Sequence, residues 1–126
     1  MARSAVTVTD LTAPANPLVP SVTDPAGTTV DQANGNTIAG VRPEVLVLRV
    51  ANTSGSAVNV IVRAGALPLA ESSGQGDLTV SVAATTGVVW LGPFESARFL
   101  QADGSVSVDY AAGFAGKVTA FKVNRR

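Results

Sequence analysis

The sequence contains neither cysteine nor histidine, and aromatic residues make up only 5% of its 126 positions. Without cysteine the chain has no disulfide framework and no thiolate metal site. Without histidine it lacks the side chain that most often transfers protons near neutral pH, and its serines have no imidazole to act as their base. The Asp-x-Asp spacing of a calcium loop does not occur either. We therefore predict a protein that is not an enzyme, with no catalytic, cofactor-binding or metal-binding residues.

Charge of one sign is not in excess, because 9 basic and 9 acidic residues cancel. A balanced chain is not steered toward nucleic acid or acidic membranes by its overall field, and we expect neither as a partner. The apolar stretches are only a few residues long, far short of the roughly 20 that a membrane-spanning helix needs. Residues 5–10 also lack an apolar core of signal-peptide length. We therefore expect a soluble chain without a targeting signal.

Valine is what the chain has in abundance, at 20 of its 126 positions. It alternates with serine, threonine and small residues, and this period of two is typical of strands with one buried face. The pattern predicts strands over 5–9, 28–31, 44–51, 57–63, 78–82, 88–91, 96–101, 106–110 and 117–123. Turn residues separate them, at Asn34–Asn36, Asn52–Ser56 and Asp103–Gly104. We predict an all-β fold, an antiparallel β-sandwich or jelly roll of about seven to nine short strands.

Four prolines interrupt residues 11–27, at positions 14, 17, 20 and 25. Proline removes a ladder donor and biases the preceding residue toward an extended conformation. This stretch is therefore predicted to be an extended arm rather than part of a sheet interior. We accordingly divide the chain into an N-terminal strand with its proline-rich arm, residues 1–40, and a β-sandwich domain, residues 41–126.

Three apolar segments are candidates for contact with other molecules: the arm, the Leu-Pro-Leu sequence in a long polar loop, and the segment from Gly92 to Phe99. For the second and third we favour packing within the same chain, whereas for the arm both interpretations stay open. We assign Trp90 and Tyr110 to the core. The candidate interface residues are Leu11, Leu18, Val19, Val22, Leu67, Leu69, Phe94 and Arg98.

Five segments in order carry a family resemblance: Leu48–Thr53, Arg63–Gly65, Gly74–Val80, Gly92–Phe99 and Gln101–Gly104. Together they resemble small β-proteins encoded among the head genes of tailed phages and prophages of actinobacteria, which are similar to head decoration, or capsid cement, proteins. The resemblance covers about residues 44–122. It implies a virion structural protein that is made in the host cytoplasm, lies on the capsid surface and stabilises the shell by bridging neighbouring subunits. The implied partners are the major capsid protein and further copies of the chain itself, as a dimer or trimer.

Two alternatives stay open. Within the same class, the chain would be a tail or baseplate component. From a different class, it would be a carbohydrate-binding or other ligand-binding β-module. Exposed Trp90 and Tyr110 on one flat face would favour ligand binding, whereas a buried Trp90 and an arm that leaves the domain would favour decoration.

Overall fold

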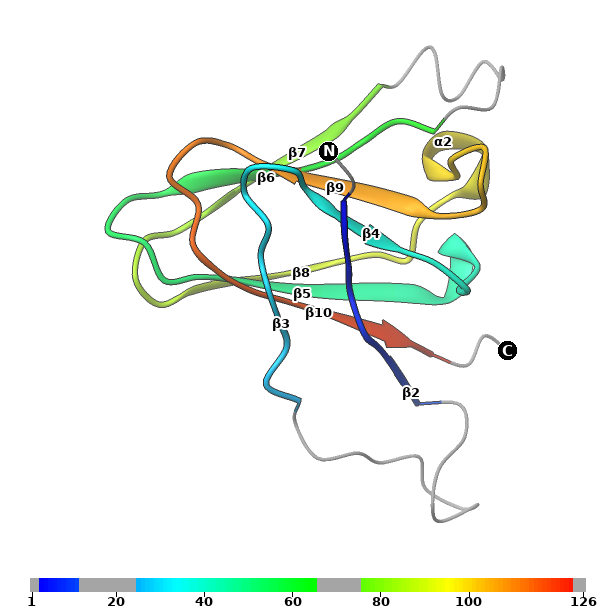
Figure 1. Cartoon of the computed structure of the whole chain (residues 1–126), viewed down its shortest axis with the longest axis horizontal. Coiled ribbons are helices and arrows are strands. Elements are labelled where there is room, and N and C mark those ends of the chain that lie inside the picture. The colour runs from blue at the N-terminus through cyan, green and yellow to red at the C-terminus, as the bar shows by residue number, and fades with distance from the viewer. Residues whose placement is uncertain (1–2, 12–24, 66–75, 124–126) are drawn as a thin grey trace.

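A computed structural model describes residues 3–11, 25–65 and 76–123, and strands dominate these ranges (Figure 1). Two five-stranded sheets enclose one hydrophobic core, which confirms the predicted all-β sandwich. The first sheet has the order β1 (Ser4–Ala5), β4 (Asn36–Ile38), β9 (Val106–Tyr110), β6 (Val58–Val62) and β7 (Leu78–Val82). The second has the order β2 (Val8–Asp10), β10 (Gly116–Lys122), β5 (Leu46–Asn52) and β8 (Gly87–Leu91), and β3 (Thr28–Thr29) also pairs with β10.

The valine alternation places the core between these sheets. In β5 every second residue is buried, and the side chains of Leu46, Leu48 and Val50 are fully buried. Val60 and Val62 of β6 are buried to the same degree in the facing sheet. Burial of one such side chain stabilises the fold by roughly 1.5–3 kcal/mol, so the core rests on small increments from many aliphatic side chains. As predicted, β5 is a central strand, with β10 on one side and β8 on the other.

The N-terminal segment makes both sheets mixed, whereas we predicted purely antiparallel pairing. β1 runs parallel to β4, and β2 runs parallel to β10. Between them Val6 is only 6% exposed and belongs to the core, so the predicted strand 5–9 is two short strands. Figure 1 shows this dark blue segment passing from the first sheet to the second. The described parts of residues 1–40 contribute strands to both sheets, and the division at residue 40 stays a prediction.

Residues 12–24 of the predicted arm lie outside the described residues. The residues that flank them are both fixed to the second sheet. The amide of Leu11 donates to the carbonyl of Lys122 at 2.8 Å. The carbonyl of Pro25 accepts a hydrogen bond from Nη2 of Arg49 at 3.0 Å. The described residues on the two sides of 12–24 are therefore held by β10 and by β5.

The strand predicted over 96–101 is wrong, because Ser96–Phe99 forms a short helix, α2. The amides of Phe99 and Leu100 close its turn by donating to the carbonyls of Glu95 and Ser96, at 3.0 and 3.1 Å. The amide of Ser96 donates to the Glu44 carboxylate at 2.9 Å and so ties α2 to the 3₁₀ turn η1 (Pro43–Val45). Four residues are too few to distinguish a period of two from one helical turn.

Two predicted hairpins are also wrong, although their turns are present. The loop after Asn52 joins β5 to β6, and these strands lie in different sheets. Its turn is held by the Asn52 side chain, whose Nδ2 donates to the carbonyls of Ser56 and Val82 at 3.0 and 3.1 Å. The turn at Asp103–Gly104 joins α2 to β9, so no strand precedes it. Loop composition fixes the turn, but sheet membership is decided by distant contacts.

Candidate functional site

Three of the predicted interface residues lie in the described ranges, and these are Leu11, Phe94 and Arg98. Leu11 is half-buried where the N-terminal segment leaves β10. The other five lie outside the described residues: Leu18, Val19, Val22, Leu67 and Leu69. The candidate site is therefore built from surfaces that the described residues form.

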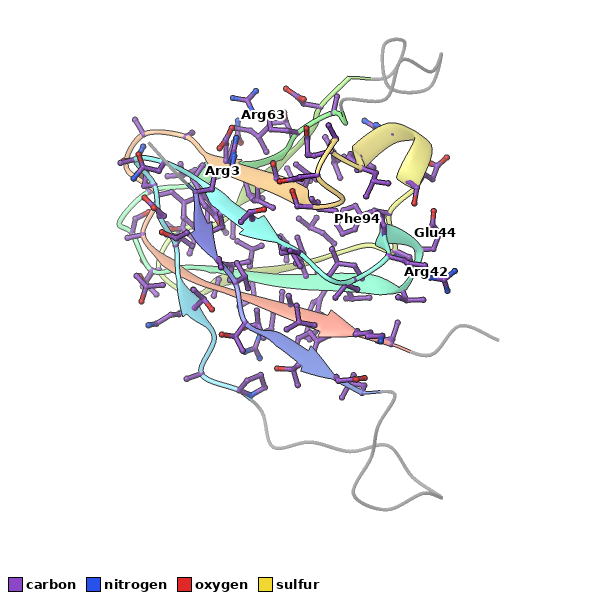
Figure 2. All side chains as sticks on the ribbon, turned by 45° about the vertical axis from the view of Figure 1, so that its right-hand side comes forward. Arg3, Arg42, Glu44, Arg63 and Phe94 are labelled. Atoms are coloured by element: carbon purple, nitrogen blue, oxygen red, sulfur yellow. The ribbon has the colours of Figure 1, made fainter. Side chains whose placement is uncertain are left out.

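Phe94 packs inside its own chain, with only 3% of its surface exposed (Figure 2). Its ring meets the edge of Phe99 at a centroid distance of 5.3 Å and an interplanar angle of 80°. Its amide donates to the carbonyl of Pro43 at 2.9 Å. This aromatic pair joins α2 to η1 and offers little surface to another molecule, as we favoured for this segment.

Arg98 also bonds within the chain. Its guanidinium lies 4.7 Å from the ring centroid of Phe99, within the range of a cation–π contact. Nε donates to the carbonyl of Gly76 at 3.1 Å, and Nη2 donates to that of Asp77 at 3.4 Å. Arg98 therefore connects α2 to the residues that lead into β7.

An apolar hollow of about 400 Å³ opens beside this junction, lined mainly by the segment before η1 and by α2. Val41, Pro43 and Leu100 supply its apolar wall, and the exposed Arg42 stands at its side. The predicted apolar segment Gly92–Phe99 contributes Ser96 to this hollow, and Leu100 follows directly after the segment. Its size suits one or two apolar side chains of a partner.

Trp90 is exposed, so its assignment to the core is wrong. It is 60% exposed, and its neighbour on the same face of β8, Val88, is 50% exposed. They are the exposed large hydrophobic residues of the described chain. The indole stacks on the ring of Phe121 at 5.8 Å and 24°, and the guanidinium of Arg49 lies 5.8 Å from the indole centroid. An apolar patch therefore covers the outer face of the second sheet at its β8 edge.

Tyr110 is buried at 5% exposure, which confirms its assignment to the core. Its ring packs on Phe114 at 5.0 Å. Burial raises the pKa of its hydroxyl, and that oxygen has no hydrogen-bond partner among the described residues. The two aromatic residues therefore do not form one flat exposed platform, and Trp90 is not buried either. We expected both aromatic residues to be exposed in a ligand-binding module and Trp90 to be buried in a decoration protein. The structure matches neither pattern fully.

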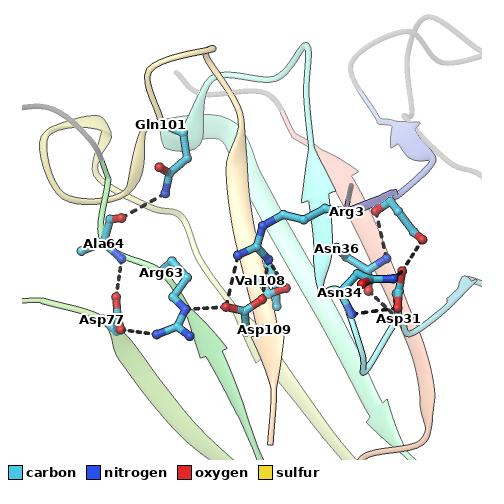
Figure 3. A network of polar contacts seen from close by, with 11 residues as sticks. Arg3, Asp31, Asn34, Asn36, Arg63, Ala64, Asp77, Gln101, Val108 and Asp109 are labelled. Atoms are coloured by element: carbon cyan, nitrogen blue, oxygen red, sulfur yellow. Dashed lines mark hydrogen bonds and ion pairs between the residues drawn. The ribbon is translucent and has the colours of Figure 1, made fainter. Parts of the chain in front are cut away.

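A polar network that sequence patterns did not predict ties the N-terminus to the first sheet (Figure 3). Arg3 forms a two-pronged ion pair with Asp109 of β9, and its Nη1 also donates to the carbonyl of Val108 at 3.1 Å. Nε of Arg63 pairs with Oδ2 of Asp109, and Nη1 of Arg63 lies 2.8 Å from Oδ2 of Asp77. One carboxylate thus joins segments that are far apart in sequence, and no local motif announces such a cluster.

The electrostatics of the network follow from these contacts. Partial burial by itself would raise the pKa of Asp109, but hydrogen bonds from Arg3 and Arg63 outweigh it and hold that pKa below its ordinary value. The amide of Ala64, which donates to Asp77 at 2.6 Å, is the main cause of the lowered pKa of Asp77. Both carboxylates are therefore ionised near neutral pH and act as fixed acceptors.

A second cluster beside it holds the turn before β4. The Ser4 hydroxyl donates to Asp31 at 2.6 Å and is the main cause of the lowered pKa of that carboxyl. Nδ2 of Asn36 donates to the carbonyl of Ser4 at 3.0 Å. Gly35 sits between the two clusters at φ +82°, where an added Cβ would lie 2.2 Å from both Arg3 and Asp109. The N-terminal segment is thus fitted closely into the sandwich.

Within the described residues, no group of three or more acidic side chains is arranged to hold a metal ion. No helix in the described ranges is both long and apolar enough to cross a membrane. Comparison of the chain with protein-family models, with curated protein sequences and with solved structures finds no match. The family resemblance of residues 44–122 therefore stays a prediction.

Proposed function

We propose that the protein decorates a phage capsid and stabilises the shell by bridging neighbouring capsid subunits. The resemblance of residues 44–122 to capsid cement proteins supports this proposal. The structural observation that carries it is the anchoring of the chain on both sides of residues 12–24. Leu11 follows a segment paired with both sheets, and Pro25 is held by Arg49 of β5. A load on the arm would therefore be shared by the whole sandwich.

Bridging then needs no special chemistry. One copy that contacts two or three capsid subunits binds the second within a high effective concentration, so modest contacts add to a strong attachment. An extended arm would add a strand to the sheet edge of a neighbour through backbone hydrogen bonds. The protein would be made in the host cytoplasm and would remain on the capsid surface of the virion, with the major capsid protein as its partner.

The direct test mixes the purified protein with expanded capsid shells, with unexpanded precursors and with isolated tails, and measures co-sedimentation. We expect binding to expanded shells and little to precursors or tails. Binding to tails alone would support the tail or baseplate alternative. Binding to none of the three particles contradicts a virion role.

The role of the arm can be tested without disturbing the sandwich. Deleting residues 1–27 would also remove β1 and β2, so we choose the triple variant Leu18→Ser, Val19→Ser, Val22→Ser instead. We expect shell affinity to fall at least about tenfold, which corresponds to about 1.4 kcal/mol. The matched control is Leu67→Ser with Leu69→Ser, the second candidate segment, for which we expect little change. Unchanged binding of the triple variant would show that the arm is not the anchor.

The exposed indole of Trp90 favours carbohydrate binding as a second candidate function. Aromatic rings with one free face are common platforms for apolar faces of ligands. Titration of the protein with soluble cell-wall polysaccharide, followed by Trp90 fluorescence, tests this candidate. A saturable shift would support ligand binding, and a flat titration would oppose it. Because Trp90 is the single tryptophan of the sequence, the variant Trp90→Ala is measured by calorimetry instead, and we expect it to lose binding.

A further inference from the structure

β8 is an edge strand whose free side can be identified residue by residue. Among the described residues it pairs with β5 alone. The amide of Thr53 donates to Ala115 on the β10 side, whereas the carbonyl of Ser54 accepts from Thr85 on the β8 side. Because hydrogen-bonding directions alternate along an antiparallel strand, even-numbered residues of β5 bond to odd-numbered residues of β8. The backbone N–H and C=O groups of Val88 and Trp90 therefore point to the free edge.

This edge lacks the features that normally protect one. The strand Gly87–Leu91 contains no charged residue and no proline, and its two exposed side chains are Val88 and Trp90. Exposed apolar edge strands readily pair with another strand, so soluble proteins usually add a charge, a proline or a cover. The other edge on this side of the sandwich, β7, shows the contrast, because its exposed side chains are Thr79 and Ser81.

We propose that β8 strands of two copies pair antiparallel about a two-fold axis at Val89, which joins the second sheets of both copies into one. In this register Val88 of each copy lies opposite Trp90 of the other. Both positions have outward backbone groups, so each pair exchanges two hydrogen bonds. The exposed apolar side chains meet on one face, and cross-strand pairs of an aromatic with a β-branched residue are favourable.

A second copy is the occupant that this edge fits best. The strand is self-complementary in the register about Val89, and since it carries no charge, no like charges meet across the axis. A two-fold axis also closes the assembly at two copies, because each copy has a single β8. Five-residue strands bury little area compared with the roughly 1,200–2,000 Å² of stable interfaces, so the dimer is expected to be concentration-dependent. The inference stands independently of the capsid proposal.

Single cysteines test the register, since the natural chain has none. In the proposed dimer Val89 lies opposite its own copy at a non-hydrogen-bonded site, with Cα atoms about 4.5 Å apart, which a disulfide can bridge. Val88 lies diagonal to its copy at about 7–8 Å, too far for a good disulfide. Under mild oxidation we expect Val89→Cys to give covalent dimers and Val88→Cys to give few. The reverse result, or equal yields, overturns the register.

Sedimentation velocity over a range of concentrations tests the dimer itself. We expect the unmodified protein to shift from monomer to dimer, Val88→Lys to remain monomeric, and Ser81→Lys on the polar β7 edge to dimerise normally. Val88→Pro provides a second variant if Val88→Lys fails to fold, because the lost N–H points to the free edge and is not used by β5. A monomer at every concentration, or a dimer that survives both substitutions at Val88, overturns the proposal. Pairing of β8 only with a strand of another protein would overturn it as well.

Discussion

Asp109 has two ionic partners, because Arg3 and Arg63 both contact it. Its side chain is 20% exposed, so water replaces these contacts poorly. We expect Asp109→Asn to lower the free energy of unfolding at pH 7 by about 1.5–3 kcal/mol, the range for hydrogen bonds to charged groups. Chemical denaturation measures the loss. Asp103→Asn is the control, because that exposed carboxylate accepts only from Ser105 in its own turn.

The contacts of Asp109 also predict how the stability of the fold depends on pH. The folded pKa of Asp109 lies below the ordinary 3.8. A carboxyl with a depressed folded pKa stabilises the fold fully above the unfolded value, and this contribution is lost as pH falls toward the folded value. The stability difference between the natural chain and Asp109→Asn should therefore be constant near neutral pH and shrink in acid below about pH 4. A difference that grows on acidification would contradict the assigned direction.

Alanine substitutions at Gly35 and Gly40 distinguish the cost of a strained backbone from the cost of a steric clash. Both have positive φ, at +82° and +78°, but an added Cβ at Gly40 meets nothing within 4 Å. Alanine in a left-handed conformation costs about 1–2 kcal/mol, which both variants share. Gly35→Ala also displaces Arg3 or Asp109, so we expect it to lower the melting temperature clearly more than Gly40→Ala. Equal melting temperatures would show that the N-terminal network adds little stability.

Single residues also mark the limit of prediction from sequence. The predicted strand 88–91 is present, but its four apolar residues do not tell which face the second sheet turns inward. That choice depends on packing with distant strands, and the aromatic type of Trp90 suggested burial. The contacts among Arg3, Arg63 and Asp109 are equally non-local, because they link residues from opposite ends of the chain.

At the scale of elements, the strands with the clearest valine alternation were the ones predicted best. The predictions for β7 and β9 have the observed bounds, and those for β5, β6, β8 and β10 differ by one or two residues at an end. β4 was missed because its Asn-Thr-Ile sequence follows a strong turn signal. These residues form a strand because they pair with β9, which is distant in the sequence. The helix α2 was missed because burial of Phe99 against Phe94 outweighs a four-residue pattern.

The alternating direction of the backbone hydrogen bonds along β8 predicts where proline would destabilise this strand. Val89 bonds to Val50 of β5 in the ladder, whereas Val88 does not use its N–H there. We expect Val89→Pro to destabilise the fold by about 1–3 kcal/mol, because proline removes a ladder donor and leaves the carbonyl of Val50 without its partner. Val88→Pro should cost much less. Thermal unfolding by circular dichroism compares the two, and equal costs would contradict the deduced phase of the ladder.

At the scale of the whole molecule, the apolar patch and the described residues that flank 12–24 belong to the same sheet. Trp90 marks its β8 edge, while Leu11 and Pro25 mark the points where the arm leaves and returns. A β8 dimer would therefore place two arms on one continuous sheet. If both proposals hold, Val88→Lys should weaken shell binding through lost avidity even though the arm is intact, and co-sedimentation at concentrations below and above dimerisation would measure this.

The position of β10 has a consequence for how the protein is made. Among the described strands β10 is synthesised last, yet β2 and β3 pair only with it. Until residues 116–122 have left the ribosome, these earlier strands have no ladder to join, and one side of β5 is also open. Completion of the second sheet is therefore expected only after residues 116–122 have emerged, and a nascent chain stalled before residue 116 should be cleaved by protease in residues 8–11, which pair with β10 in the folded protein.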